Sequence, residues 1–212
     1  MIAFAYADLL QALKPIYRGL ADGLVANIRE VMPNEPILHI TDDETQAIAG
    51  CNVLRVRRKV LPMSWRLLAH ACAHEVHDEI LFTEPDVRFM CNVMDAFNDQ
   101  FDVTVTDRER PTKMKDKPMV PITLGVNFSR SAAFWTACAK RCLTLGRKPQ
   151  LWGGDMEAVY HVMQSGKYRV KTLPAAEFNH VPLSQDGWPG AKALHYKGTR
   201  KTWLFPHMSE AA

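Results

Sequence analysis

Two carboxylates separated by one residue follow an apolar run in the first half of the chain. The run Glu79–Thr83 has the length and composition of a buried strand, and Glu84, Pro85 and Asp86 follow it directly. Proline fixes its own φ angle and therefore stiffens this turn. Alternate residues can present both carboxylates to one hard cation such as Mn²⁺ or Mg²⁺, which takes carboxylate, water and phosphate ligands. A cation in this place would neutralise a diphosphate and assist its departure.

A second group of residues suited to the same chemistry lies close to the carboxyl end. His195 offers an imidazole ligand, Gly198 allows close approach of the backbone to a ligand, and Lys201 offers a point charge for a phosphate. An acidic turn alone is commonly just a solvated turn, and a single histidine is usually a surface residue. The combination predicts a divalent-metal site formed by Glu84, Asp86 and His195.

The elements that must bring these residues together follow an α/β pattern. Short apolar or alternating runs predict strands at 1–6, 36–40, 52–57, 79–83, 101–106, 121–128 and 168–173. Apolar residues spaced three and four apart predict helices at 8–31, 63–76, 132–145 and 153–164. This alternation is typical of a mainly parallel sheet flanked by helices, whose ligands bind beyond the carboxyl ends of the strands. The charged segment 107–118 and the tail after Pro182 are expected to be loops.

Length and composition describe an ordinary globular protein. The chain has 212 residues, of which 47% are hydrophobic and 23% are charged, and its net charge of +3 does not demand a nucleic-acid partner. Its apolar runs are shorter than the ~20 residues that cross a bilayer, and its first residues lack the features of a secretory signal. Five cysteines without metal-type spacing predict reduced core residues, so we expect a cytoplasmic protein, or one in the host cytoplasm if it is viral.

The order of these motifs resembles the glycogenin-like and bacterial lipopolysaccharide galactosyltransferase family of retaining glycosyltransferases. That family has a GT-A fold, a DxD metal motif and a C-terminal HxxGxxKPW motif. The resemblance spans most of the chain, and the tail motif is its most specific part. The matching residues are Glu84-Pro85-Asp86 at the DxD position and His195, Gly198, Lys201 and Trp203 in the tail.

The resemblance implies one GT-A-type domain over residues 1–212. Residues 1–90 would form the nucleotide-binding half, and residues 91–212 the sugar and acceptor half with the metal-binding tail. In the nucleotide pocket, Phe4 or Tyr6 would stack on the base and Asp42 or Asp43 would accept a hydrogen bond from it.

The same resemblance implies residues that position and process the sugar. Arg66 stands where the family has an arginine that touches the donor, and Gly125 and Asn127 belong to a strand that looks like the family's sugar-site strand. Asp155 and Glu157 fall at the two acidic positions of the family's DQD motif, and Asp155 is the expected catalytic carboxylate. Two glycines before Asp155 also allow it to cap the helix that follows.

Three departures from the family pattern bear on the chemistry. Glu84 lengthens the first metal-binding side chain by one methylene, and Thr202 replaces the proline of the tail motif. Met156 replaces the glutamine that the family places beside the reacting sugar carbon. The retaining or inverting outcome therefore stays open, as do the sugar and the base of the donor.

The expected function is metal-dependent transfer of a sugar from a nucleotide-diphosphate sugar, UDP-sugar first, to an acceptor hydroxyl. The basic segment Arg108–Lys117 has three alternative interpretations: a solvated mobile loop, a lid over the donor diphosphate, or a contact to a polyanionic acceptor. Together with Lys192–Lys201 it could line a path for DNA, and small viral glycosyltransferases that modify hydroxymethylated bases offer a precedent for that acceptor. No membrane partner is expected, and the oligomeric state stays open.

Two other functions remain as alternatives. A nucleotidyltransferase shares the sheet architecture, but the residues after the first strand lack its glycine-rich basic loop. A catalytically silent module that binds nucleotide-sugars or nucleic acid would fit the altered DxD motif and Met156.

Histidines and aromatic residues elsewhere have simpler interpretations. His70, His74 and His77 evoke a zinc helix, but their spacing does not supply a third ligand, so surface histidines are favoured. Three aromatic residues are predicted to lie in the hydrophobic core and not to form a platform for a substrate. A fourth is expected in a loop, where it either covers the acceptor or packs against the protein. The first three are Phe134, Trp135 and Trp152, and the fourth is Trp188.

Overall fold

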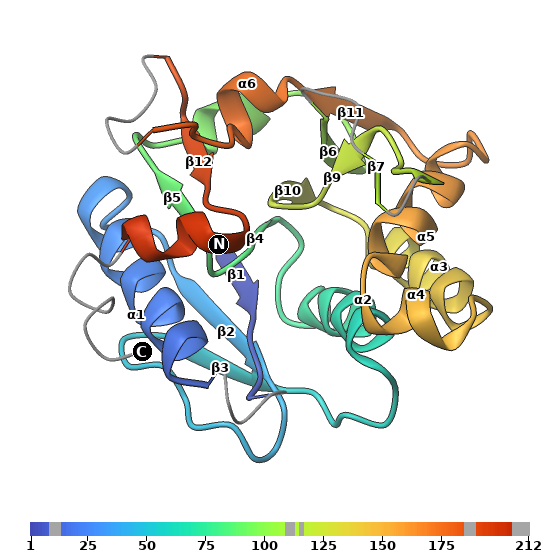
Figure 1. Ribbon diagram of the computed structural model, residues 1–212, viewed down its shortest axis with the longest axis horizontal. Coiled ribbons are helices and arrows are strands. Elements are labelled where there is room, and N and C mark those ends of the chain that lie inside the picture. Colours follow the sequence, from blue (N-terminus) through green and yellow to red (C-terminus); the bar gives the residue numbers. More distant parts are fainter. Residues whose placement is uncertain (9–13, 109–112, 115–116, 185–189, 205–212) are drawn as a thin grey trace.

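A mainly parallel sheet forms the centre of the computed structural model, which describes residues 1–8, 14–108, 113–114, 117–184 and 190–204 (Figure 1). Within the described residues its strands follow the order β11-β6-β10-β4-β1-β2-β3, and β9 pairs with β6 outside this path. The pairs on both flanks are parallel, whereas β10 runs antiparallel to β4 and β6. The strands are β1 Ile2–Ala5, β2 Ile37–Thr41, β3 Asn52–Arg55, β4 Ile80–Thr83, β6 Val103–Asp107, β9 Ile122–Thr123, β10 Val126–Ser129 and β11 Val170–Leu173.

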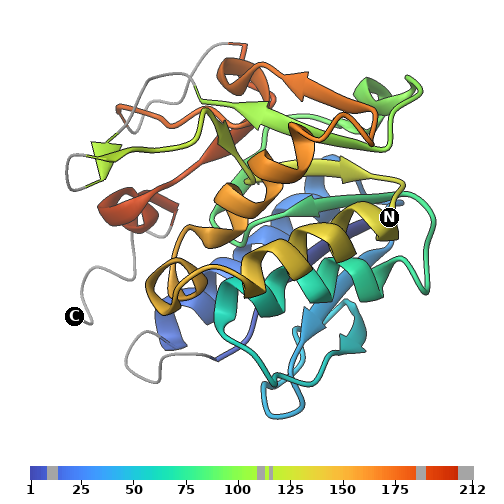
Figure 2. The same ribbon diagram turned by 90° about the vertical axis from the view of Figure 1, so that its right-hand side faces the viewer.

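Helices cover both faces of the sheet, so its central strands are buried on both sides. Helix α1 lies on one face, and α2, α3 and α5 lie together on the other, where Figure 2 shows them in front of the strands. Alternate residues of one strand face opposite ways, so Ala3 packs in the cluster with α2 while Ile2 packs in the cluster with α1. The helices are α1 Lys14–Val31, α2 Pro62–Ala73, α3 Ala132–Leu143, α4 Arg147–Leu151, α5 Gly154–Met163 and α6 Ala175–Phe178, with 3₁₀ helices η2 Met94–Phe97 and η3 Gly198–Leu204.

The expected α/β fold with a mainly parallel sheet is confirmed, and the expected helices and strands are present in the described residues. The strand expected at 121–128 is divided into β9 and β10, because the chain leaves the sheet at Leu124 and Gly125. Short elements were missed where too few residues are involved to show a period. These are β5 Val87–Phe89, β12 Ala193–His195, the pair β7 Lys113–Met114 and β8 Lys117–Pro118, and α4.

The prediction of a loop-like tail is wrong. Strand β12 pairs antiparallel with β5, and η3 then packs beside α1. Each of these strands has three residues, so their pairing depends on tertiary contacts and not on a sequence pattern. The tail is thereby fixed to the segment that follows Asp86.

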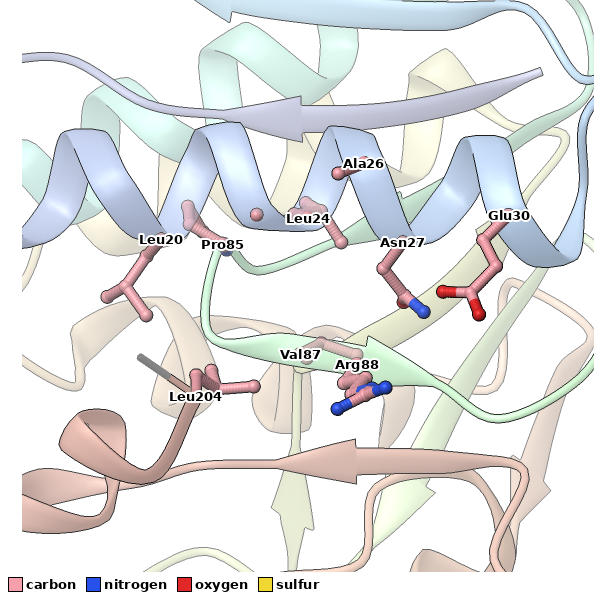
Figure 3. A pocket seen from close by; sticks show the side chains of 10 residues that line it. Leu20, Leu24, Ala26, Asn27, Glu30, Pro85, Val87, Arg88 and Leu204 are labelled. Carbon is pink, nitrogen blue, oxygen red and sulfur yellow. The ribbon is translucent and has the colours of Figure 1, made fainter. Parts of the chain in front are cut away.

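An asparagine of α1 holds strand β5 in place. The side chain of Asn27 donates to the carbonyl oxygen of Phe89 at 2.9 Å and accepts from the Phe89 N–H at 2.7 Å. Figure 3 shows Asn27 on α1 facing this strand, beside a cavity of about 190 Å³ that Val87 and Leu204 also line. Since β5 carries the pairing with the tail, Asn27 contributes to the position of the tail as well.

We expect Asn27→Ala to lower the free energy of unfolding by about 2–3 kcal/mol, because both backbone groups of Phe89 lose their buried partner. Asn27→Asp keeps an acceptor for the Phe89 N–H and should lose less. Urea unfolding followed by circular dichroism measures both values, with exposed Glu30→Ala on the same helix as the control. Equal stability of the Ala variant and the control would contradict the role of Asn27.

A buried histidine links β2 to the end of β1. His39 is fully buried, and its Nδ1 accepts from the Ile48 N–H at 3.2 Å. The other ring nitrogen, Nε2, therefore carries the proton and donates to the Tyr6 carbonyl oxygen at 3.1 Å. Burial lowers the pKa of His39 to about 4, because the charged ring would lose its hydration.

The depressed pKa of His39 makes stability depend on pH. The unfolded chain binds the proton near pH 6.5 and the folded chain only near pH 4, so the contribution is complete above pH 6.5 and is lost as pH falls towards 4. We expect a loss of about 2–3 kcal/mol over this range from His39. Unfolding curves at pH 7 and pH 4.5 should show a smaller difference for His39→Gln than for the wild type. The exposed His161→Gln variant should keep the wild-type difference, and a reversed order would refute this assignment.

Candidate metal centre and ligand cavity

A cavity of about 670 Å³ opens at the carboxyl ends of β1 and β4. Its volume lies in the range of small-molecule and cofactor sites. It is lined by residues from the ends of β1 and β4, the start of α2, the β9–β10 connection, the turn before α5 and the tail. The position agrees with the expectation that ligands bind beyond the carboxyl ends of parallel strands.

Glu84, Asp86 and His195 converge in this cavity. One potential ligand atom from each of them lies within 4.8 Å of the others, and no other such cluster of His, Cys, Asp and Glu occurs in the part of the chain that the structure describes. His195 Nε2 lies 2.9 Å from Glu84 Oε2 and 3.3 Å from Asp86 Oδ1. An arrangement of two carboxylates and one imidazole nitrogen fits a divalent cation such as Mn²⁺.

Strand pairing brings the three residues together. In the β5–β12 pair, His195 lies opposite Val87, which directly follows Asp86. The next residue of the tail, Tyr196, donates its N–H to the Asp86 carbonyl oxygen at 2.9 Å. Glu84 donates its own N–H to the carbonyl oxygen of Gly125 at 3.1 Å. The backbone on both sides of Pro85 is therefore tied to two other segments of the chain.

A buried asparagine orients the imidazole of His195. Asn179 is 2% exposed; its amide nitrogen donates to Thr123 Oγ1 at 2.8 Å, which leaves its Oδ1 to face His195 Nδ1 at 2.9 Å. The proton of His195 then belongs on Nδ1, and Nε2 is left as the metal ligand. Gly125 makes room for this pair, because a Cβ there would overlap Asn179 Oδ1 and lie 2.5 Å from His195 Nδ1.

Two cations complete the charge arrangement. Lys201 forms an ion pair with Asp86 Oδ2. Arg66 bridges Glu84 Oε1 at 2.5 Å and Asp155 Oδ2 at 3.0 Å, and it also donates to the Leu124 carbonyl oxygen at 3.2 Å. Glu84, Arg66 and Asp155 therefore form one continuous line of contacts across the cavity.

This arrangement shifts the ionisation of the buried groups in opposite directions. Burial alone would raise the pKa of Glu84, but Arg66 and His195 hold it well below its usual range. Burial would lower the pKa of His195, but Asp86 and Glu84 raise it instead. The pKa of Asp155 is raised by burial, which Arg66 offsets only in part. The two carboxylates therefore favour the protonated form of the His195 imidazole as long as no metal is bound.

The aromatic and acidic residues predicted for the nucleotide pocket are separated by the structure. Tyr6 lines the cavity and its hydroxyl hydrogen-bonds Asp8, whereas Phe4 is fully buried in the core. Asp42 is buried outside the cavity and accepts from two N–H groups of its own loop. Asp43 is exposed and lies 3.7 Å from an arginine of the same surface. Of these residues, only Tyr6 reaches the cavity.

Some of the residues predicted around the sugar line the cavity, and others lie outside it. Arg66 and Asp155 line the cavity, and so do Gly198 and Lys201 of the tail. Asn127 lies inside the sheet, where it donates to a carbonyl oxygen of β6, and Glu157 is exposed on α5. The N-cap of α5 is Gly153, so Asp155 is not the capping residue and its carboxylate faces Arg66 instead.

Some cavity residues escaped the sequence interpretation. Asp8, three residues after the end of β1, lines the cavity, although ligands are expected beyond the carboxyl ends of such strands. Arg108, the first residue of the predicted basic segment, also lines the cavity, and the rest of that segment lies partly outside the described residues. Asn179 and Thr123 gave no signal, because a polar residue that orients a ligand has no characteristic spacing from it.

The other expectations for histidines and aromatic residues have mixed outcomes. His70 is not a surface residue, since its ring is buried against Phe82 and Trp135, whereas His74 hydrogen-bonds Ser129 Oγ at 2.8 Å. Phe134 and Trp135 are core residues, as predicted. Trp152 is not, because the short helix α4 ends before it and leaves its ring at the cavity. Trp188 lies outside the described residues.

Three solved structures that are similar to this chain over more than 90% of its length are glycosyltransferases. A glycosyltransferase involved in the glycosylation of the major capsid of PBCV-1 has a TM-score of 0.62 and 15% identity, over 99% of this chain and 98% of the other. The galactosyltransferase LgtC, in complex with donor and acceptor sugar analogs, has a TM-score of 0.57 and 12% identity, over 93% and 87% of the two chains. For GlyE of Streptococcus pneumoniae these values are 0.60 and 13%, over 95% of this chain and 59% of the other.

These similarities confirm the GT-A-type fold and the resemblance to the LgtC structure at the level of the fold. No protein-family profile and no curated protein sequence matches the chain. Across the described residues, no helix combines the length and the apolar character that a membrane span requires.

We expect Asn179→Ala to weaken Mn²⁺ binding about 10–100-fold, because His195 loses the partner that fixes its orientation. Gly125→Ala should abolish binding, since its Cβ displaces both side chains. Electron paramagnetic resonance of free Mn²⁺ in a titration measures the dissociation constants without any reaction. Gly146→Ala is the matched control, because nothing lies within 4 Å of the added Cβ. Wild-type affinity in Asn179→Ala would rule out an orienting role.

Proposed function

We propose that the protein is a metal-dependent glycosyltransferase that uses a nucleotide-diphosphate sugar, with a UDP-sugar as the first candidate. The observation that carries this proposal is the convergence of Glu84, Asp86 and His195 beside Lys201 in a cavity of nucleotide-sugar size. The similar structures described above are also glycosyltransferases, and one of them contains donor and acceptor sugar analogs.

The metal end of the cavity binds the diphosphate. Glu84, Asp86 and His195 hold Mn²⁺ or Mg²⁺, which when bound neutralises the phosphates and stabilises the departing nucleoside diphosphate. Lys201 adds a second positive charge, since a phosphate can replace Asp86 as its partner. Tyr6 offers a ring for the base, and the nearby carboxylate of Asp8 limits which bases fit.

The other end positions the sugar. Arg66 holds Asp155 at 3.0 Å, so its carboxylate has one fixed orientation towards the cavity. Transfer breaks the bond between the anomeric carbon and the diphosphate oxygen and forms a bond to the acceptor oxygen, whose proton is released. Residues 1–90 thus supply the nucleotide-binding half, and residues 91–212 supply Asp155, Met156 and the metal-binding tail. The free state of all five cysteines supports action in a reducing compartment such as the cytoplasm.

DNA is the candidate acceptor that the sequence predicted. Residues 109–112 and 115–116 of the basic segment lie outside the described residues. In the tail, Lys192 forms an ion pair with Glu177 at 2.9 Å, and Arg200 lies over the ring of Trp203. A catalytically silent binding module shares the donor site and differs only in the absence of turnover.

We expect Glu84→Ala and Asp86→Ala each to reduce Mn²⁺-dependent hydrolysis of a UDP-sugar by at least about 100-fold, because the cation loses a ligand and the diphosphate its neutralising charge. Release of UDP, measured across a panel of UDP-sugars, reports this reaction without a known acceptor. The exposed Glu75→Ala variant, in the turn that follows α2, is the control for a lost surface carboxylate.

Thermal stabilisation by nucleotides separates the alternatives. UDP or a UDP-sugar at about 100 times its dissociation constant should stabilise the fold by about 2.7 kcal/mol, and only with Mn²⁺ or Mg²⁺ present. Stabilisation by UDP without hydrolysis or transfer would indicate the silent module. If no nucleotide or nucleotide-sugar stabilises the protein with either metal, the proposed function is wrong.

A further inference from the structure

Trp152 places a large exposed ring at the edge of the cavity. Its side chain is 56% exposed, whereas Trp65 and Trp135 are 3% and 0% exposed. It lines the same cavity as the metal cluster. Its indole N–H has no hydrogen-bond partner among the described residues. A tryptophan left uncovered in this way is a frequent anchor for a ligand with an apolar face.

The backbone around Trp152 fixes the position from which this side chain projects. The Trp152 N–H donates to the carbonyl oxygens of Lys148 and Pro149, both at 3.1 Å. Gly153 has a φ of +79°, which a side chain would strain, and a Cβ on Gly154 would lie 2.5 Å from the Pro149 carbonyl oxygen. Both glycines are therefore needed for a turn that ends in the buried Asp155. The exposed indole and the buried carboxylate are positioned by the same rigid turn.

The line of contacts that leads away from the metal cluster ends at the turn that carries Trp152. Glu84 of the metal cluster contacts Arg66, and Arg66 contacts Asp155, which follows Trp152 by three residues. A donor with its diphosphate at the metal and its sugar at Arg66 and Asp155 leaves Trp152 beyond the reacting carbon. That is where the acceptor must lie.

The surroundings of Trp152 favour an uncharged acceptor. The cavity there is also lined by the apolar side chains of Met63, Met119 and Met156. Arg108 lines the cavity as well, but its guanidinium is already bonded. It donates to the carbonyl oxygens of Val120 and Ile122, both at 3.0 Å, and one of its nitrogens lies 3.5 Å from Met156 Sδ. Arg66 is bound by two carboxylates, and the proposed function assigns Lys201 to the donor diphosphate, so neither cation is left for the phosphates of a nucleic-acid acceptor.

We propose that Trp152 forms the acceptor subsite and that the acceptor is a sugar whose C–H face stacks on the indole. A pyranose has an apolar face for the ring and hydroxyls at its edge, one of which can accept from the indole N–H. The inference rests on the proposed function, because it concerns the second substrate of the same reaction. The acceptor hydroxyl oxygen gains the bond to the anomeric carbon and loses its proton to solvent, and the nucleoside diphosphate leaves with the metal.

Saturation-transfer difference NMR tests this assignment with the methyl α- and β-pyranosides of glucose and galactose. The protein is saturated with UDP and diamagnetic Mg²⁺, so that the donor end is occupied without paramagnetic broadening of the glycoside signals. At least one glycoside should bind through its ring C–H protons, and Trp152→Ala should weaken its binding about tenfold, with Trp152→Phe in between. Leu151→Ala, which removes a neighbouring exposed side chain that does not line the cavity, should bind as the wild type does.

The outcomes separate this inference from the proposed function. Wild-type UDP and Mn²⁺ binding in Trp152→Ala, together with weakened glycoside binding, supports the acceptor subsite. Three results overturn it while leaving the donor chemistry intact: no glycoside binds the wild type, Trp152→Ala binds the glycoside equally well, or a single-stranded oligonucleotide binds in a Trp152-dependent way instead. A raised Michaelis constant for UDP-sugar hydrolysis in Trp152→Ala would show that Trp152 contacts the donor sugar and not the acceptor, and would overturn the inference as well. Absence of UDP binding to the wild type contradicts the proposed function, and the acceptor subsite with it.

Discussion

The pairing of two three-residue strands is the constraint on which the candidate site depends. β12 places His195 opposite Val87, and the Tyr196 N–H then binds the carbonyl oxygen of Asp86. Without this pairing, the acidic turn has two carboxylates and no imidazole, and Asp86 lacks its partner Lys201. So short a ladder is not stable by itself. Its stability comes from α1, which holds β5 through Asn27, and from the apolar packing around both strands.

Charge balance imposes a second requirement on the site. Glu84, Asp86 and Asp155 are largely or fully withdrawn from water, and isolated buried carboxylates are costly. Arg66 bridges two of them and Lys201 binds the third, so each negative charge has a partner before any ligand arrives. A metal that displaces the proton of His195 enters a cluster whose geometry is already fixed. Preorganisation of this kind lowers the cost of binding a highly charged donor.

The sequence allowed the chemistry to be predicted better than the geometry. The three candidate metal ligands were predicted to lie together because a strand end and a tail motif each carry a recognisable spacing, and they do converge. Arg66 and Asp155, which the family resemblance suggested, line the same cavity. Phe4 and Asp43 were misplaced, since periodicity predicts a strand but not which of its residues faces a cavity beyond its end. Nothing in the sequence indicated that Asn179 orients His195. This role arises from contacts with Thr123 and from the space that Gly125 leaves, and both residues lie far from Asn179 in the chain. Short elements such as β12 depend on tertiary pairing and leave almost no local pattern.

The contact between Asp86 and Lys201 joins residues 115 positions apart in the chain. A cation bound by Glu84, Asp86 and His195 would act as a cross-link over nearly the same loop, and it must be released before the chain can unfold. Binding to the native state alone raises stability by mass action. If the cation binds as proposed, the free energy of unfolding would therefore rise with the concentration of free divalent cation. Metal depletion would then destabilise the fold as well as remove the binding site for a donor.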